Sequence, residues 1–224
     1  EPTHFVIFNS IEEQVSKLVS SIYLGNSKEI IDGLLEVSEA ECLTVQKKLV
    51  NDLEPTKHTF KTIATSLSLT KAIDELTKTE SADFIVMGSK GKTAAEKIFI
   101  GSNSYTAVKT VDEIPLLIIP GELDFNVPSK IGFASGFEKS YSKRQLAPLK
   151  KINNLFDVQT TIIHVYKEEK LKEEQLANLY HLLEISKKED FELNWLAETR
   201  NKADTILDYV YEEKIDILAM SYYK

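Results

Sequence analysis

The chain has 224 residues, of which 42% are hydrophobic and 28% are charged, and its formal net charge is -8 at pH 7. This balance is ordinary for a globular protein, and the length suits two small domains, since a typical domain has ~100–200 residues. No apolar run approaches the ~20 residues of a membrane span, and the acidic charge argues against a nucleic-acid-binding surface. The single cysteine excludes an internal disulfide, and no leader-like segment precedes the first predicted strand, so we expect a cytoplasmic protein.

Short apolar runs rich in isoleucine, valine and phenylalanine predict β-strands. Their continuous apolar character is typical of strands that are buried on both faces of a parallel sheet. In chain order they are Phe5–Phe8, Phe84–Met87, Leu116–Ile119, Ile131–Phe133, Thr161–Val165 and Ile215–Met220.

Helical patterns lie between these runs. Apolar residues at helical spacing follow Ser68, a candidate N-cap, and a second such set, Ala203–Val210, precedes Asp216. Residues 41–53 and 104–110 are also predicted to be helical. The alternation of strands and helices predicts an α/β layered fold with right-handed crossovers.

The sequence contains an internal repeat. Residues 60–87 align without gaps with residues 193–220, and the apolar positions coincide throughout, as in DFIVM at 83–87 and DILAM at 216–220. Residues 6–10 match residues 161–165 at a shorter spacing. We therefore predict two copies of one strand–helix unit.

The copies are joined by a segment, 120–128, that contains two prolines and a glycine. We predict domain 1 at 1–121, a linker at 122–129 and domain 2 at 130–224. Copy two opens with a strand and helix that have no counterpart in copy one, whereas copy one continues past Met87 and copy two stops at Lys224. Together they outline one unit of five strands. We therefore expect both domains to be incomplete and the sequence to be part of a longer tandem protein.

A glycine-rich segment directly follows the strand that ends at Met87. Gly88 and Gly91 are followed, after nine residues, by Gly101 and Ser102, which open a predicted helix. A helix N-terminus at the carboxyl end of a parallel strand favours an anion, most plausibly phosphate. Glycine there permits a close approach of the ligand or a positive φ. The alternative interpretation is that these glycines only turn the chain and cap helices.

Two better-known nucleotide motifs do not fit this segment. A Walker A loop needs a glycine five positions before Gly91, where Val86 stands. The dinucleotide fingerprint fails because position 90 is a lysine and the third glycine lies ten residues after Gly91. These mismatches exclude a P-loop NTPase and argue against NAD.

The spacing Gly88-x2-Gly91-x9-Gly101-Ser102, with its preceding strand and the segment IPLLIIP at 114–120, resembles the ATP-binding signature of the universal stress proteins. The resemblance covers nearly the whole chain as a tandem of two such domains. It implies that each domain is flavodoxin-like, with a parallel five-stranded sheet in the order 3-2-1-4-5 flanked by helices. It also implies an adenine nucleotide (ATP, AMP or ADP, with or without Mg2+) and a homodimer or a pairing of domain 1 with domain 2.

The same resemblance assigns the site residues. Six residues would contact ribose and phosphates through their backbone: Met87, Gly88, Gly91, Gly101, Ser102 and Asn103. Ser89 and Lys90 are the other two residues of the predicted site. Family members end their first strand in Pro-Thr-Asp, where copy two has Ala134-Ser135-Gly136. Copy two also has Ser221 and Lys224 in place of the first two glycines. We therefore expect one working site, in domain 1, and a degenerate domain 2.

The sequence contains no recognisable catalytic or metal-binding motif. His4, His58, His164 and His181 lack metal-ligand spacing and are interpreted as surface or strand-end residues, and Cys42 is interpreted as a packed, inert thiol. We therefore expect a non-catalytic nucleotide-binding module of a stress response. The alternatives are a slow ATPase or phosphoryl transferase, which would need a base or a metal-holding carboxylate, and a nucleotide-free interaction protein of the same fold.

Overall fold

The structure is a computed structural model that describes residues 2–19, 27–52, 57–89, 101–111, 114–121, 126–166, 168–186 and 191–222. The chain divides into two compact units, unit 1 (Glu1–Ile118) and unit 2 (Ile119–Lys224).

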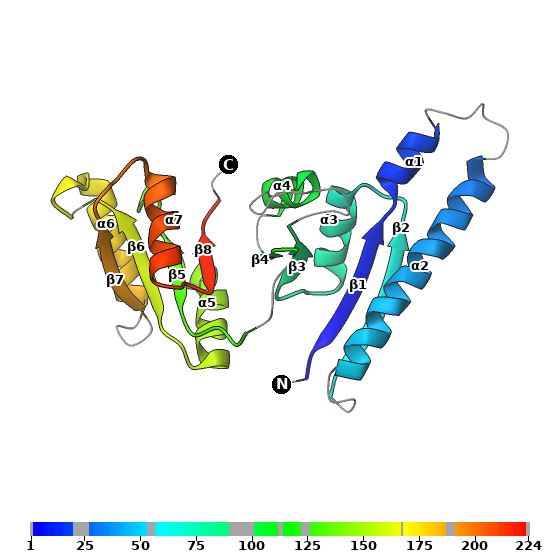
Figure 1. Cartoon of the computed structure of the whole chain (residues 1–224), viewed down its shortest axis with the longest axis horizontal. Helices are drawn as coiled ribbons and strands as arrows, with labels where there is room; N and C mark the ends of the chain where they lie inside the picture. The colour runs from blue at the N-terminus through cyan, green and yellow to red at the C-terminus, as the bar shows by residue number, and fades with distance from the viewer. Residues whose placement is uncertain are drawn as a thin grey trace. The chain divides into compact units, whose positions relative to one another are not determined.

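Unit 1 combines parallel β-strand pairing with covering helices (Figure 1). Its elements are β1 (His4–Ser10), α1 (Glu12–Val19), α2 (Ser27–Asp52), β2 (Thr59–Thr65), α3 (Leu69–Thr79), β3 (Ile85–Gly88), α4 (Ser102–Thr110) and β4 (Leu116–Ile119), which ends at the unit boundary. β1 and β2 pair in parallel, with His4 opposite Thr59 and Ser10 opposite Thr65. β3 and β4 form a separate two-stranded sheet. The long helix α2 runs beside β1 and β2 (Figure 1).

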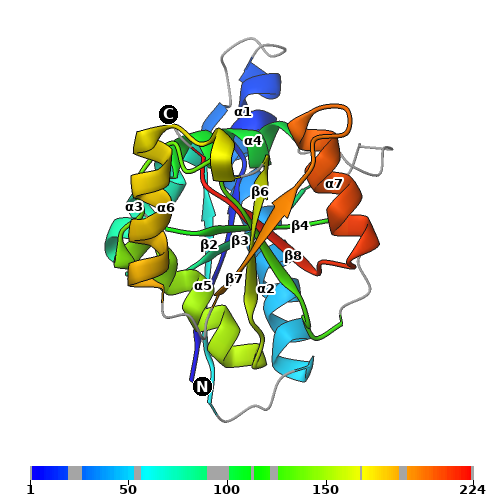
Figure 2. The same ribbon diagram turned by 90° about the vertical axis from the view of Figure 1, so that its left-hand side faces the viewer.

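Unit 2 is built around one parallel sheet in the strand order β7-β6-β5-β8. Figure 2 shows α5 and α6 on one side of this sheet and α7 on the other. The elements are β5 (Ile131–Ala134), α5 (Lys143–Phe156), β6 (Thr160–Val165), a 3-10 turn (Glu168–Lys170), α6 (Glu173–Ile185), β7 (Phe191–Leu196), α7 (Lys202–Glu212) and β8 (Ile217–Met220).

The predicted α/β fold, with parallel strands flanked by helices, is confirmed. Each predicted strand overlaps an observed one, although β3 and β8 begin one and two residues later than predicted, and β2 and β7 are additional strands. Both additional strands lie at sheet edges and mix polar with apolar residues (TFKTIAT and FELNWL), so they lack a continuous apolar run. The predicted helices at 41–53 and 104–110 lie within longer helices, although Leu53 falls outside the described residues.

The strand orders of the two units correspond through the internal repeat, which pairs β1 with β6, β2 with β7 and β3 with β8. Unit 2 holds the first four positions of the order 3-2-1-4-5. In unit 1 the pairs β1-β2 and β3-β4 correspond to positions 2-3 and 4-5, and no strand in its described part corresponds to β5. Neither unit therefore contains a complete five-stranded sheet within the described residues.

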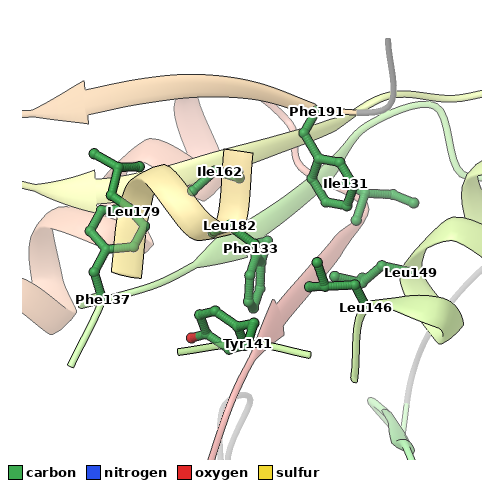
Figure 3. Close-up of a cluster of buried hydrophobic side chains, with 10 residues drawn as sticks. All are labelled: Ile131, Phe133, Phe137, Tyr141, Leu146, Leu149, Ile162, Leu179, Leu182 and Phe191. Atoms are coloured by element: carbon green, nitrogen blue, oxygen red, sulfur yellow. The ribbon is translucent and has the colours of Figure 1, made fainter. Parts of the chain in front are cut away.

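The core of unit 2 lies between its sheet and the helices α5 and α6 (Figure 3). Its strands contribute apolar side chains from one face, and the two helices contribute leucines from their inner faces. Burial of this side-chain area stabilises the unit by the hydrophobic effect. The ten residues are Ile131, Phe133, Phe137, Tyr141, Leu146, Leu149, Ile162, Leu179, Leu182 and Phe191.

Polar contacts fix the ends of several elements. The predicted N-cap of α3 is confirmed, because the Ser68 hydroxyl accepts a hydrogen bond from the Lys71 N–H at 3.4 Å. In unit 2, Asp216 accepts hydrogen bonds from the Ser129 N–H at 2.8 Å and the Lys130 N–H at 3.0 Å. These bonds, that from Ser129 above all, hold the pKa of the Asp216 carboxyl below its usual value. They fasten the beginning of β5 beside β8.

Candidate functional site

The carboxyl end of β3 and the first turn of α4 meet at one point in unit 1. The Gly101 N–H donates a hydrogen bond to the Ser89 carbonyl at 2.6 Å, and the Ser104 hydroxyl donates one to the Gly88 carbonyl at 2.8 Å. Two successive carbonyls at the end of the strand are therefore bonded to the beginning of the helix. The two glycine-containing parts of the predicted motif lie side by side.

The first turn of α4 offers backbone N–H groups to a ligand. Gly101 is the N-cap and provides no side-chain cap, and the first intrahelical bond runs from the Tyr105 N–H to the Gly101 carbonyl at 2.9 Å. The N–H groups of the three residues between them have no acceptor within the helix, and the helix dipole makes this end positive. Ser102 and Asn103 are exposed, and the first turn holds no acidic residue. This end of the helix can therefore receive an anion.

The structure brings together six of the eight predicted site residues. Met87, Gly88 and Ser89 lie at the end of β3, and Gly101, Ser102 and Asn103 lie at the beginning of α4. Lys90 and Gly91 lie outside the described residues. No described glycine has a positive φ, so Gly88 and Gly101 do not serve to provide a left-handed turn. At Gly101, where φ is -59°, the absence of a side chain instead leaves the beginning of α4 uncovered.

Ser104 also lies at this junction, where it is only 2% exposed, and no role is predicted for it from sequence. In sequence it is an ordinary polar residue in the first turn of a helix. The available signal was its position three residues after Gly101, where an N-terminal side chain can reach back towards the preceding strand. Its hydroxyl lies against β3 and not in the exposed part of the site.

Other candidate groups were also located. Cys42 is buried on α2, and burial raises the pKa of its thiol, as expected of a packed and unreactive cysteine. The described part of the chain contains no cluster of three or more His, Cys, Asp or Glu side chains that could bind a metal ion. Among the same residues, no helix is both long and apolar enough to cross a membrane.

In unit 2, side chains of the unit itself pack and form hydrogen bonds around the segment that follows β5. Ser135 follows β5, and its hydroxyl accepts a hydrogen bond from the Phe137 N–H at 3.2 Å and lies 3.1 Å from the Tyr141 hydroxyl. The Asn178 amide donates to the Phe137 carbonyl at 2.9 Å. Phe137 itself is fully buried with a φ of 54°. The residues that stand in place of Pro-Thr-Asp are thus part of a packed turn.

His164 on β6 belongs to the same packed region. Its Nδ1–H donates to the Ser135 carbonyl at 2.7 Å, and its ring stacks on Phe137 with the centroids 4.7 Å apart. The ring also meets Trp195 edge-on, at a centroid distance of 5.4 Å. Burial lowers the pKa of this imidazole, because the charged form loses water. The expectation of a strand-end residue is correct, but His164 is buried and not at the surface.

Acidification is expected to destabilise unit 2 through His164. The unfolded chain titrates this histidine near pH 6.5, whereas the folded pKa is lower, so the unfolded state takes up the proton first as the pH falls. The stabilisation is complete above about pH 6.5 and is lost progressively below it. Lys202 adds to the lowering of the pKa, and the Ser135 carbonyl and Glu138 oppose it.

Urea unfolding between about pH 7.5 and pH 5, followed by the fluorescence of Trp195, measures this effect. The variant His164→Asn, which carries the residue found at the repeat-related position 9, is expected to show a flatter pH profile. His181→Asn, on the exposed surface of α6, is the matched control. Identical pH profiles for wild type and His164→Asn would contradict the prediction.

Residues 19–120 match the profile of the Universal stress protein family. A universal stress protein from Archaeoglobus fulgidus DSM 4304 superimposes with a TM-score of 0.63 at 20% identity, over 97% of this chain and 86% of the other. No curated protein matches the sequence.

Two structures from Pseudomonas aeruginosa have similar folds. A putative universal stress protein from strain UCBPP-PA14 gives a TM-score of 0.55 at 10% identity, over 98% of this chain and 82% of the other. A functionally unknown protein from strain PAO1 gives 0.51 at 10% identity, over 98% and 81%. At these identities the structural matches establish likeness of fold alone.

Proposed function

We propose, from the match of residues 19–120 to the Universal stress protein family, that the chain binds an adenine nucleotide at the junction of β3 and α4 and acts without catalysis. The same match supports a role in stress response. The nucleotide would be ATP, AMP or ADP. Unit 2 would be a second, degenerate copy that takes up no nucleotide in this manner.

The observation that carries the proposal is the junction of Gly88 and Ser89 with the beginning of α4. A phosphate placed there would meet the N–H groups and the positive dipole end of α4, with the Ser102 hydroxyl as a further donor. Since the first turn of α4 holds no carboxylate, Mg2+ would be bound through the phosphates of the nucleotide and not through this turn. Lys90, outside the described residues, would add positive charge.

Calorimetric titration of the nucleotide-free, full-length chain with ATP, ADP and AMP, with and without Mg2+, tests the proposal. We expect one site per chain. A folded protein that binds none of these nucleotides would contradict it and favour a nucleotide-free interaction protein. Formation of ADP from ATP above the rate in buffer would contradict the absence of catalysis.

We also propose a cytoplasmic location and a pairing of two copies, or of the two units, as the resemblance implies. Sedimentation equilibrium of the full chain over a range of concentrations measures the first kind of pairing. A mass that stays at one chain throughout would exclude the homodimer.

A further inference from the structure

Ser104 connects α4 to the end of β3 on the buried side of the candidate site. It is the third residue of α4, its side chain is buried, and its hydroxyl donates to the Gly88 carbonyl at 2.8 Å. Since this carbonyl stands at the last position of β3, the hydroxyl satisfies an acceptor at the end of the strand. A buried serine at this position therefore has a defined partner across the junction.

The bond also fixes the direction of the neighbouring backbone. In a trans peptide the carbonyl and the N–H of the next residue point in opposite directions, so holding the Gly88 carbonyl towards α4 turns the Ser89 N–H away from Ser104. The second bond, from the Gly101 N–H to the Ser89 carbonyl at 2.6 Å, holds the following peptide. Together the two bonds set the position of the first turn of α4 relative to the end of β3.

We propose that Ser104 is a positioning residue of the nucleotide site. Its hydroxyl does not touch the nucleotide. It holds the Gly88 carbonyl against α4, so that the backbone of Gly88 and the N–H groups of Ser102 and Asn103 converge on the same phosphates. The inference rests on the proposed function, and it adds a residue outside the glycine motif that determines affinity. Binding groups need to be held within about 0.5 Å of their working geometry, and this bond provides that restraint.

Three substitutions separate the hydroxyl from the size of the side chain. Ser104→Thr keeps the hydroxyl, Ser104→Val has the shape of threonine without it, and Ser104→Ala removes it without adding volume. Thr106→Val, at an exposed position of the same helix, is the matched control for the loss of a hydroxyl. Each full-length variant is titrated with ATP under conditions in which urea unfolding shows that it is folded.

The affinity of Ser104→Val and Ser104→Ala is expected to fall about tenfold, the effect of one lost hydrogen bond, while Ser104→Thr and Thr106→Val stay within about threefold of wild type. The carbonyl carbon resonance of Gly88 is expected to shift in the first two variants only. That readout reports the hydrogen bond without nucleotide.

Wild-type affinity in the folded Ser104→Ala variant would overturn the inference. Equal weakening in Ser104→Thr and Ser104→Val would also overturn it, since size and not the hydroxyl would then be responsible. Failure of the wild-type chain to bind any nucleotide would reject the proposed function itself. The same titration series therefore distinguishes the two failures.

Discussion

Gly101→Asp is expected to remove nucleotide binding without unfolding the chain. Aspartate is among the preferred N-cap residues, and the φ of -59° and ψ of 160° at Gly101 suit it, so α4 should be as stable as before or slightly more so. The new carboxylate would lie at the positive end of the helix, where the proposal places the phosphates, and would repel them. We expect the affinity for ATP to fall by on the order of 100-fold or more, the effect of two like charges held close together.

Titration calorimetry measures the affinity, and urea unfolding measures the stability of the same samples. Gly33→Asp is the matched control, because Gly33 lies on α2 with no atom near its missing side chain. This control is expected to bind ATP as the wild type does. Unchanged binding by Gly101→Asp would place the nucleotide elsewhere on the chain.

Leu182→Ala is expected to lower the free energy of unfolding of unit 2 by about 2–5 kcal/mol, the usual cost of removing a buried leucine side chain from a core. Leu182 is 0% exposed and lies on α6 within the core cluster (Figure 3). Trp195, the only tryptophan of the chain, packs against that cluster, so its fluorescence reports the unfolding of unit 2.

The number of ATP molecules bound by Leu182→Ala tests whether nucleotide binding depends on the stability of unit 2. If the working site lies in unit 1 alone, Leu182→Ala should still bind one ATP per chain. Leu155→Ala, at a leucine of α5 that is 66% exposed, controls for the substitution and should change stability little. A loss of ATP binding in parallel with the unfolding of unit 2 would contradict a site confined to unit 1.

Strands with a continuous apolar run could be predicted from sequence, whereas strands that mix polar with apolar residues could not. The apolar runs of β5 and β6 are typical of inner strands, and both strands lie inside the sheet of unit 2. β2 and β7 expose one edge and carry lysine, glutamate and asparagine, so only the repeat signals them. Hydrophobic runs alone do not detect strands that are half exposed.

The glycine spacing allowed the candidate site to be predicted, but side-chain contacts between residues distant in sequence could not be predicted. Gly88 and Gly101 stand out because three of the 8 glycines of the chain fall within fourteen positions directly after a predicted strand. The hydroxyl of Ser104 donates to the carbonyl of Gly88, 16 positions earlier in the chain. In unit 2, His164 likewise contacts Ser135, Phe137 and Trp195, which are distant from it in sequence. One sequence without a fold does not reveal such pairs.

The strand order of unit 2 also determines when its sheet can form during synthesis. β5 is an inner strand, and one of its edges pairs with β6, which follows soon after it in the chain. The other edge pairs with β8, the last strand among the described residues, and Asp216 accepts hydrogen bonds from the backbone of Ser129 and Lys130 across the same long separation. On the ribosome, the second edge of β5 therefore stays unpaired until residues 216–220 have emerged, since Asp216 follows Lys130 by 86 residues.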